Sequence, residues 1–153
     1  MHDVHDPTWL CERIVDTSGD AVVFADRDGV IRLWNGGAED IFGYSRTEAI
    51  GRTLDLIIPE KLRGRHWAGY RRVMETGVTR YGREVLAVPA VCKDGSRRSI
   101  EFTVAVVRDD GGSLVGIAAV LRDVTARFEE GRRLRARLRA LEERVRDPDE
   151  PPP

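Results

Sequence analysis

The sequence predicts an α+β fold, with a single five-stranded antiparallel sheet, helices on one face of the sheet and a separate amphipathic helix after it. Apolar, strand-like runs joined by Gly-containing turn signals occur in both halves of the chain, which indicates antiparallel hairpins at both ends. The helix signals are grouped between these hairpins, as in α+β folds. After residue 122 the composition shifts to Arg, Glu, Leu and Ala, which favour a helix.

The first elements are a short helix and a hairpin. Residues 8–18 predict an amphipathic helix with one buried side. That side would carry Trp9, Leu10 and Ile14, with Val15 as a further candidate. Two apolar runs follow, 21–25 and 30–34, and the Asp28-Gly29 turn between them predicts that they pair.

Helix-capping signals mark the middle of the chain. Asn35 is expected to be the N-cap of a helix over 36–42. Residues 45–48 fit a capping box, which would start another short helix. Pro59 is well placed to begin a longer helix that runs to about residue 75.

In the second half of the chain, apolar residues recur at every second position, as they do in strands. A strand over 84–91 contains Pro89, which confines that strand to an edge or a bulge of the sheet. The run 98–106 alternates cleanly between apolar and polar residues. Its inward side chains would be Ile100, Phe102, Val104 and Val106. The run 114–121 is almost continuously apolar, so we expect it at the centre of the sheet.

We therefore divide the chain into four parts. They are an N-terminal cap helix region (1–19), a globular domain (20–125), a coiled-coil helix (126–146) and a disordered tail (147–153). In the coiled-coil helix, apolar residues recur at spacings of 4, 3 and 4, namely Leu134, Leu138, Leu141 and Val145. This seam predicts a homodimer through 134–145, and it leaves open whether the two helices run parallel.

The composition argues against several classes of function. The chain of 153 residues is 41% hydrophobic and has a net charge of −1, so nothing draws it to nucleic acid or to an anionic membrane. Its apolar runs are far too short for a membrane span and its start lacks a signal-peptide pattern, so a cytoplasmic location is expected. The cysteines, Cys11 and Cys92, lack metal-binding spacing. Without a general acid/base pair, nucleophile motif or phosphate loop, we expect no enzyme.

His66 is the most informative side chain in the sequence. On the predicted helix it shares one face with Leu62, Tyr70, Val73 and Met74, because these residues recur at helical spacing. A titratable imidazole therefore lies in the stripe that should face the core. It is either buried and hydrogen-bonded to a neighbour, or it binds a ligand.

Several short motifs, in this order, resemble those of PAS domains over roughly residues 10–125. They are Ala25-Asp26-Arg27-Asp28-Gly29-Val30-Ile31, Trp34-Asn35-Gly36-Gly37-Ala38-Glu39, Phe42-Gly43-Tyr44-Ser45, Glu48-Ala49-Ile50-Gly51, Lys93-Asp94-Gly95-Ser96 and Arg122-Asp123-Val124-Thr125. The resemblance implies a single PAS domain over 20–125 that acts as a sensor or interaction module. It also implies that the last motif is the junction to a signalling helix over 126–146.

Within this family the chain resembles the haem-binding subgroup more than the flavin photosensors, since the stretch around 67–72 lacks their cysteine. The resembling residues are Ile58-Pro59-Glu60, Arg63, His66 and Tyr70. The resemblance implies haem b with His66 as the proximal iron ligand and Tyr70 nearby, and it implies that Arg72 and Arg80 hold the haem propionates. Neutral imidazole is a common axial ligand, and guanidinium groups bind carboxylates well.

At one position the residue differs from that of the oxygen-sensing members of the subgroup. They carry an arginine on a strand facing the open side of the iron, where this chain has Leu86. Phe102 and Val104 would complete an apolar distal wall. Because bound O₂ gathers negative charge and needs a hydrogen-bond donor, CO, NO or a redox change is the more plausible signal.

Two alternatives to haem remain from the same resemblance. The chain would then be a ligand-free PAS module that dimerises or binds other proteins, or a sensor of small acids. No output domain is recognisable in the sequence, so we expect either that a downstream signalling protein in trans receives the signal or that the chain is a fragment of a longer protein.

Overall fold

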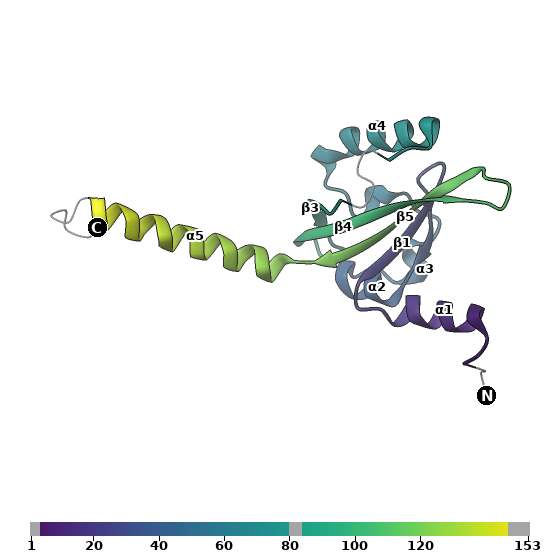
Figure 1. The fold of residues 1–153 in the computed structure, drawn as a ribbon, viewed down its shortest axis with the longest axis horizontal. Coiled ribbons are helices and arrows are strands. Elements are labelled where there is room, and N and C mark those ends of the chain that lie inside the picture. The colour runs from purple at the N-terminus through teal and green to yellow at the C-terminus, as the bar shows by residue number, and fades with distance from the viewer. Residues whose placement is uncertain (1–3, 80–83, 147–153) are drawn as a thin grey trace. The chain divides into compact units, whose positions relative to one another are not determined.

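The computed structural model describes residues 4–79 and 84–146, and it confirms the predicted α+β fold with one five-stranded antiparallel sheet (Figure 1). The elements in chain order are α1 (Pro7–Thr17), β1 (Ala21–Asp26), β2 (Ile31–Trp34), α2 (Gly36–Phe42), α3 (Arg46–Ala49), the 3₁₀ turn η1 (Leu54–Leu56), α4 (Glu60–Thr76), β3 (Leu86–Val91), β4 (Arg97–Arg108), β5 (Leu114–Asp123) and α5 (Thr125–Arg146). The predicted tail over 147–153 lies outside the described residues.

The strand order β2-β1-β5-β4-β3 confirms two predictions about the sheet. The almost continuously apolar β5 is its central strand, and β3, which contains Pro89, is an edge strand. Close packing in the centre explains Gly116 of β5. A Cβ atom there would lie 2.1 Å from the carbonyl oxygen of Ala25 on β1, so only glycine fits.

The core lies on one face of the sheet, under α2 and α3. Its largest fully buried apolar side chains are Trp34, Phe42, Ile31 and Ile100. The Trp34 and Phe42 rings pack with centroids 5.5 Å apart, and the Trp34 indole N–H donates to the carbonyl of Tyr44 at 3.0 Å. Strand β2 is therefore joined to α2 by an apolar contact and to the segment after α2 by a polar one.

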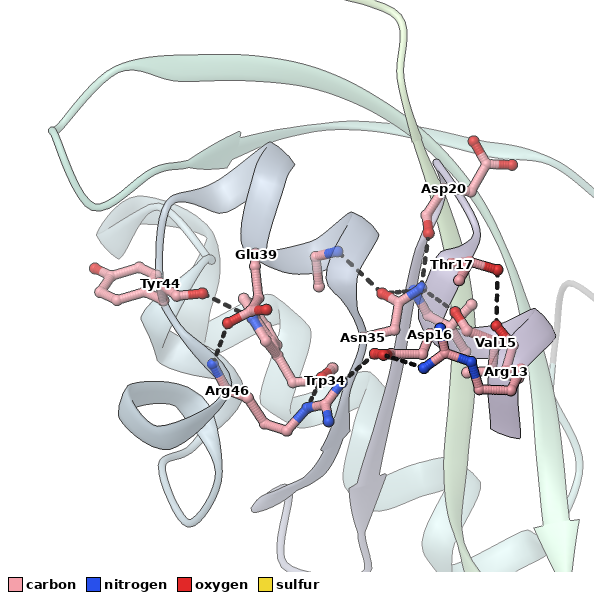
Figure 2. A network of polar contacts seen from close by, with 12 residues as sticks. Arg13, Val15, Asp16, Thr17, Asp20, Trp34, Asn35, Glu39, Tyr44 and Arg46 are labelled. Atoms are coloured by element: carbon pink, nitrogen blue, oxygen red, sulfur yellow. Dashed lines mark hydrogen bonds and ion pairs between the residues drawn. The ribbon is translucent and has the colours of Figure 1, made fainter. Parts of the chain in front are cut away.

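Asn35 confirms its predicted role as the N-cap of α2 and does more than cap (Figure 2). Its side-chain oxygen accepts from the backbone N–H groups of Val22 at 2.8 Å and Ala38 at 2.9 Å. Its side-chain nitrogen donates to the carbonyls of Val15 at 2.7 Å and Asp20 at 3.0 Å. One side chain, 1% exposed, thus joins the end of α1, the first strand and the start of α2.

The prediction that α1 buries its apolar side is wrong. Leu10 and Ile14 are 39% and 60% exposed, and no residue of α1 is buried. Trp9 and Val15 are half-buried. Polar contacts also hold the helix, through the Asp16–Arg46 ion pair and the hydrogen bond from Asn35 (Figure 2). An amphipathic pattern shows that a helix has an apolar side, but it does not show that this side is covered within the same chain.

The chain divides into two compact units, Met1–Asp123 and Val124–Pro153. The described part of the second unit is the helix α5, whose large apolar side chains are all exposed. In the part of the chain that the structure describes, no helix combines the length and apolarity that crossing a membrane requires.

Candidate functional site

Helix α4 carries the apolar stripe that the sequence predicts. It begins directly after Pro59, and it ends at Gly77, which adopts the left-handed conformation with φ +68°. Within the helix Tyr70 is buried and the other members of the stripe, Leu62, His66, Val73 and Met74, are half-buried. Most of the residues between them are exposed, so the stripe faces the protein.

Tyr70 attaches the middle of α4 to the end of β1. Its hydroxyl group shares its proton between the carbonyl oxygens of Asp26 at 2.6 Å and Ala25 at 3.1 Å. Burial, aided by the nearby carboxylates of Asp26 and Asp28, raises the pKa of Tyr70 above its ordinary value. The hydroxyl therefore stays protonated and acts as a donor to the backbone.

Trp67 attaches the first half of α4 to the turn between β1 and β2. Its indole N–H donates to the Asp55 carboxylate at 2.7 Å, and its ring lies against Gly29, where a Cβ atom would be 2.1 Å away. Arg63 also donates to the backbone carbonyl of Asp55, at 3.2 Å. Asp55 was not predicted from the sequence, because nothing local marks an acid whose partner lies twelve residues further on.

The far end of α4 is fixed by a residue of β4. The Arg108 guanidinium donates to the carbonyl of Gly77, at the end of α4, at 3.1 Å. It also donates to the carbonyl of Gly112, in the β4–β5 turn, at 3.0 Å. Helix α4 is thus held at three points along its length, and its inward stripe has a defined orientation.

His66 lies between the two aromatic anchors. Its ring meets Trp67 edge-on, with centroids 4.8 Å apart, and is tilted against Tyr70 at 5.8 Å. Burial lowers the pKa of His66, and the negative charge of Asp55 only partly offsets this. At neutral pH the imidazole is therefore uncharged, which is the form that binds metal.

One atom of His66 lacks a partner. Its Nδ1 is buried, and within residues 4–79 and 84–146 it makes no hydrogen bond. Buried polar atoms are rarely left unpaired, because water and protein groups normally satisfy them. An unpaired imidazole nitrogen among aromatic rings therefore fits the position of a ligand to a bound group.

The predicted distal residues share one face of the sheet. Leu86 of β3 lies directly opposite Phe102 of β4, and Val104 follows two residues later on the same face. Ile100, on the same face, is only 1% exposed, whereas Leu86, Phe102 and Val104 are half-buried. Ile100 itself is therefore covered, whereas the side chains of the predicted wall are only partly covered.

Only one of the two arginines assigned to the propionates lies within the described residues. Arg72 is exposed, and it lies six residues after His66, which places it about 120° away around the helix. Arg80 lies outside the described residues.

The described residues form no ion site made by protein ligands alone. Within residues 4–79 and 84–146, no three His, Cys, Asp or Glu side chains come together to hold a metal ion. A haem requires only one axial side chain, because its porphyrin supplies the other ligands. A single neutral imidazole whose Nδ1 lacks a partner is therefore compatible with haem, whereas it does not by itself form a site for a free metal ion.

Two ion pairs hold the end of β5, where the chain leaves the sheet. The Arg122 guanidinium donates two hydrogen bonds to the Asp20 carboxylate, at 3.1 and 2.8 Å, and this lowers the pKa of Asp20. The Asp123 carboxylate lies 3.7 Å from the Arg98 guanidinium of β4. Strand β4 and the residue directly before β1 thus both contact the residues that precede α5.

Comparison with known proteins gives the family. A model of the PAS fold matches residues 15–129. The sensor protein FixL of Bradyrhizobium diazoefficiens is 29% identical over 132 residues, which cover 84% of this chain and 24% of that protein. The oxygen sensor protein DosP of Escherichia coli is 30% identical over 122 residues, which cover 80% of this chain and 15% of that protein. The chain thus spans a quarter or less of these curated relatives.

A solved structure agrees with the sequence match. The PAS domain of a protein from Colwellia psychrerythraea superimposes with a TM-score of 0.69 and 25% identity, over 79% of this chain and 99% of that one. The sheet order, the helices between the hairpins and the match over 15–129 all lead to one conclusion. The chain belongs to the PAS-fold family.

Proposed function

We propose that this chain is a sensor domain that binds haem b, with His66 as the axial ligand of the iron, and that it passes a gas or redox signal to α5. The observation that carries the proposal is the buried, unpaired Nδ1 of His66. Burial also keeps this imidazole in the neutral form that iron requires. The similarity to FixL, a sensor, and to DosP, an oxygen sensor, supports the same function.

The residues around His66 would orient the ligand and exclude water. Trp67 and Tyr70 flank the imidazole, and each is itself hydrogen-bonded, to Asp55 and to the end of β1. Such supporting contacts fix the direction of a metal ligand and strengthen its binding. Bound haem would supply an iron centre that takes up a diatomic gas or changes its redox state. Arg72 and Arg80 remain the proposed contacts of the propionates, because guanidinium groups bind carboxylates well, and Arg72 is exposed.

The opposite wall of the site would decide which gas is held. Leu86, Phe102 and Val104 present apolar side chains on the inner face of the sheet, and none of them can donate a hydrogen bond. A hydrogen-bond donor stabilises bound O₂ more than it stabilises bound CO. The proposed signals are therefore CO, NO or a change of redox state, with O₂ bound more weakly.

The signal would leave through the end of β5. Gas binding near Phe102 and Val104 would shift β4, and the Arg98–Asp123 and Arg122–Asp20 ion pairs connect the sheet to the residues before α5. The exposed seam of α5 would pair with a second copy through 134–145, and a signalling protein in trans would respond to that pairing.

Titration with hemin tests the proposal. The wild-type chain is expected to develop a sharp Soret band that saturates at equimolar hemin. In His66→Ala the affinity should fall by about 100-fold or more, because the axial ligand is lost. Arg65→Ala, an exposed neighbour on the same helix, serves as the control and should titrate as the wild type does. Equal titration of the His66 variant would exclude it as the ligand.

Replacing Leu86 tests the distal wall. We expect Leu86→Arg to raise the affinity of the ferrous, haem-loaded chain for O₂ by about tenfold, since a charge-assisted hydrogen bond contributes about 1.5 kcal/mol. The CO affinity should change little, and Leu86→Met should leave both nearly unchanged. Gas titrations followed by absorption give the affinities. A variant that shifts CO and O₂ equally would show that position 86 does not face the gas.

A ligand-free interaction module is the second candidate, and the apolar side chains exposed on α1 and α5 favour it. In that case the spectrum with hemin would be featureless or unchanged by the replacement of His66, and dimerisation would be the property to study.

A further inference from the structure

The charges of α5 are ordered along its apolar seam. The seam side chains are all exposed, Leu134 at 57%, Leu138 at 56%, Leu141 at 49% and Val145 at 83%. The pairing of this seam with a second copy is part of the proposed function. The orientation of the two helices rests on that pairing, and it does not depend on haem.

The spacing of the seam assigns a heptad position to every residue of the helix. Steps of 4, 3 and 4 place Leu134 and Leu141 at heptad position d, and Leu138 and Val145 at position a. The preceding d position is Arg127. The preceding a position is Gly131, which has no side chain to fill the seam. The apolar contact is therefore expected to begin at Leu134.

The positions that flank the seam carry charges of both signs. Position g, directly before a, holds Glu130, Arg137 and Arg144. Position e, directly after d, holds Arg135 and Glu142. In a parallel, in-register pair each g residue faces the e residue that lies five positions later on the other helix. Glu130 then meets Arg135 of the second copy, and Arg137 meets Glu142, so all these contacts are between opposite charges.

An antiparallel pair would not be equally favourable. Aligning Leu134 with Val145 of the other helix brings g residues beside g residues and e residues beside e residues. Arg137 would then lie next to Arg144 of the second copy, a contact between like charges that occurs twice. Only the Arg135–Glu142 contacts would remain attractive.

We propose that α5 pairs with α5 of a second copy in parallel and in register, and that interhelical contacts of Glu130 with Arg135 and of Arg137 with Glu142 select this orientation. Arg137 is a better probe of these contacts than Glu130. Glu130 also lies 3.9 Å from Arg133 of its own helix, so its replacement would disturb the isolated helix as well.

Sedimentation of the full chain gives the dimer affinity of each variant. Arg137→Glu should weaken the dimer roughly tenfold, because two attractive contacts become repulsive. Glu142→Arg should do the same, and an equimolar mixture of the two variants should recover most of the affinity, since their charges match each other. Arg139→Glu is the control, because position b carries the same change of charge away from the seam.

The sign of the Arg137→Glu effect distinguishes the two orientations. In an antiparallel pair this variant would remove the contact with Arg144 and tighten the dimer, which would overturn the proposal. Leu138→Glu with Leu141→Glu is measured beside it. If the dimer persists unchanged in that double variant, the pairing of α5 itself is refuted, whereas a hemin result of either sign bears only on the haem site.

Disulfide trapping provides an independent measurement of orientation. In a Cys11→Ser background, Val145→Cys should cross-link to the same residue of the second copy under mild oxidation, because a positions face each other in a parallel pair. In the antiparallel pair the two cysteines would be about 16 Å apart along the axis, too far for a disulfide. Dimers that form without cross-linking would contradict the parallel arrangement.

Discussion

Asn35→Ala is expected to lower the free energy of unfolding by about 3 kcal/mol, because it leaves several buried backbone groups without partners. The side chain is 1% exposed and makes hydrogen bonds to Val15, Asp20, Val22 and Ala38. Denaturant unfolding followed by circular dichroism measures the loss. The variant should also free the end of α1, which makes α1 more sensitive to proteolysis than the strands.

Ser45→Ala is the matched control for Asn35. Ser45 also caps a helix, since its hydroxyl accepts from the N–H of Glu48 at 3.2 Å, but this contact is exposed. Its loss should cost about 1 kcal/mol. If the two alanine variants lost equal stability, water would be replacing the contacts of Asn35, and its role as a buried link would be refuted.

Gly29→Ala is expected to cost about 3 kcal/mol and to weaken hemin binding as well. The residue has φ +76°, which is strained for alanine by about 1 kcal/mol, and the new Cβ would overlap the Trp67 ring at 2.1 Å. The ring must move, and it contacts His66 directly. Denaturant unfolding and the hemin titration measure the two effects on the same preparation.

Gly95→Ala separates the cost of backbone strain from the cost of steric overlap. Gly95 has φ +82°, but no atom lies within 4 Å of a Cβ placed there. Its replacement should cost only the strain of about 1 kcal/mol and leave hemin binding unchanged. In a Trp67→Leu background, the loss of unfolding free energy caused by Gly29→Ala should fall toward the same strain cost of about 1 kcal/mol. An undiminished cost there would mean that the turn itself, not the contact with α4, requires glycine.

Most of the fold could be predicted because its signals are local. The N-cap at Asn35, the position of Pro89 in an edge strand and the apolar run of β5 each depend on residues close in sequence. The face of α4 that carries His66 also follows from helical spacing alone. Each of these predictions needed only the chemistry of one segment.

Other features depend on contacts that the sequence does not reveal. The apolar side of α1 was expected to be buried, but Leu10 and Ile14 are exposed, and an ion pair between Asp16 and Arg46 helps to hold the helix. Asp55 and Gly29 meet Trp67 across a turn, so neither is marked by its neighbours. The roles of Arg72 and Arg80 stay predictions. The motifs of the family suggest them, and the geometry of the described residues does not test them.

The most direct test of His66 as the axial ligand is chemical rescue. His66→Gly is titrated with hemin in the absence and presence of free imidazole, with circular dichroism to verify that the variant is folded. If His66 is the ligand, the sharp Soret band is lost in the variant and returns when imidazole occupies the space left by the side chain. A folded His66→Gly variant that binds hemin as tightly as the wild type, or one that imidazole fails to restore, would contradict this role of His66.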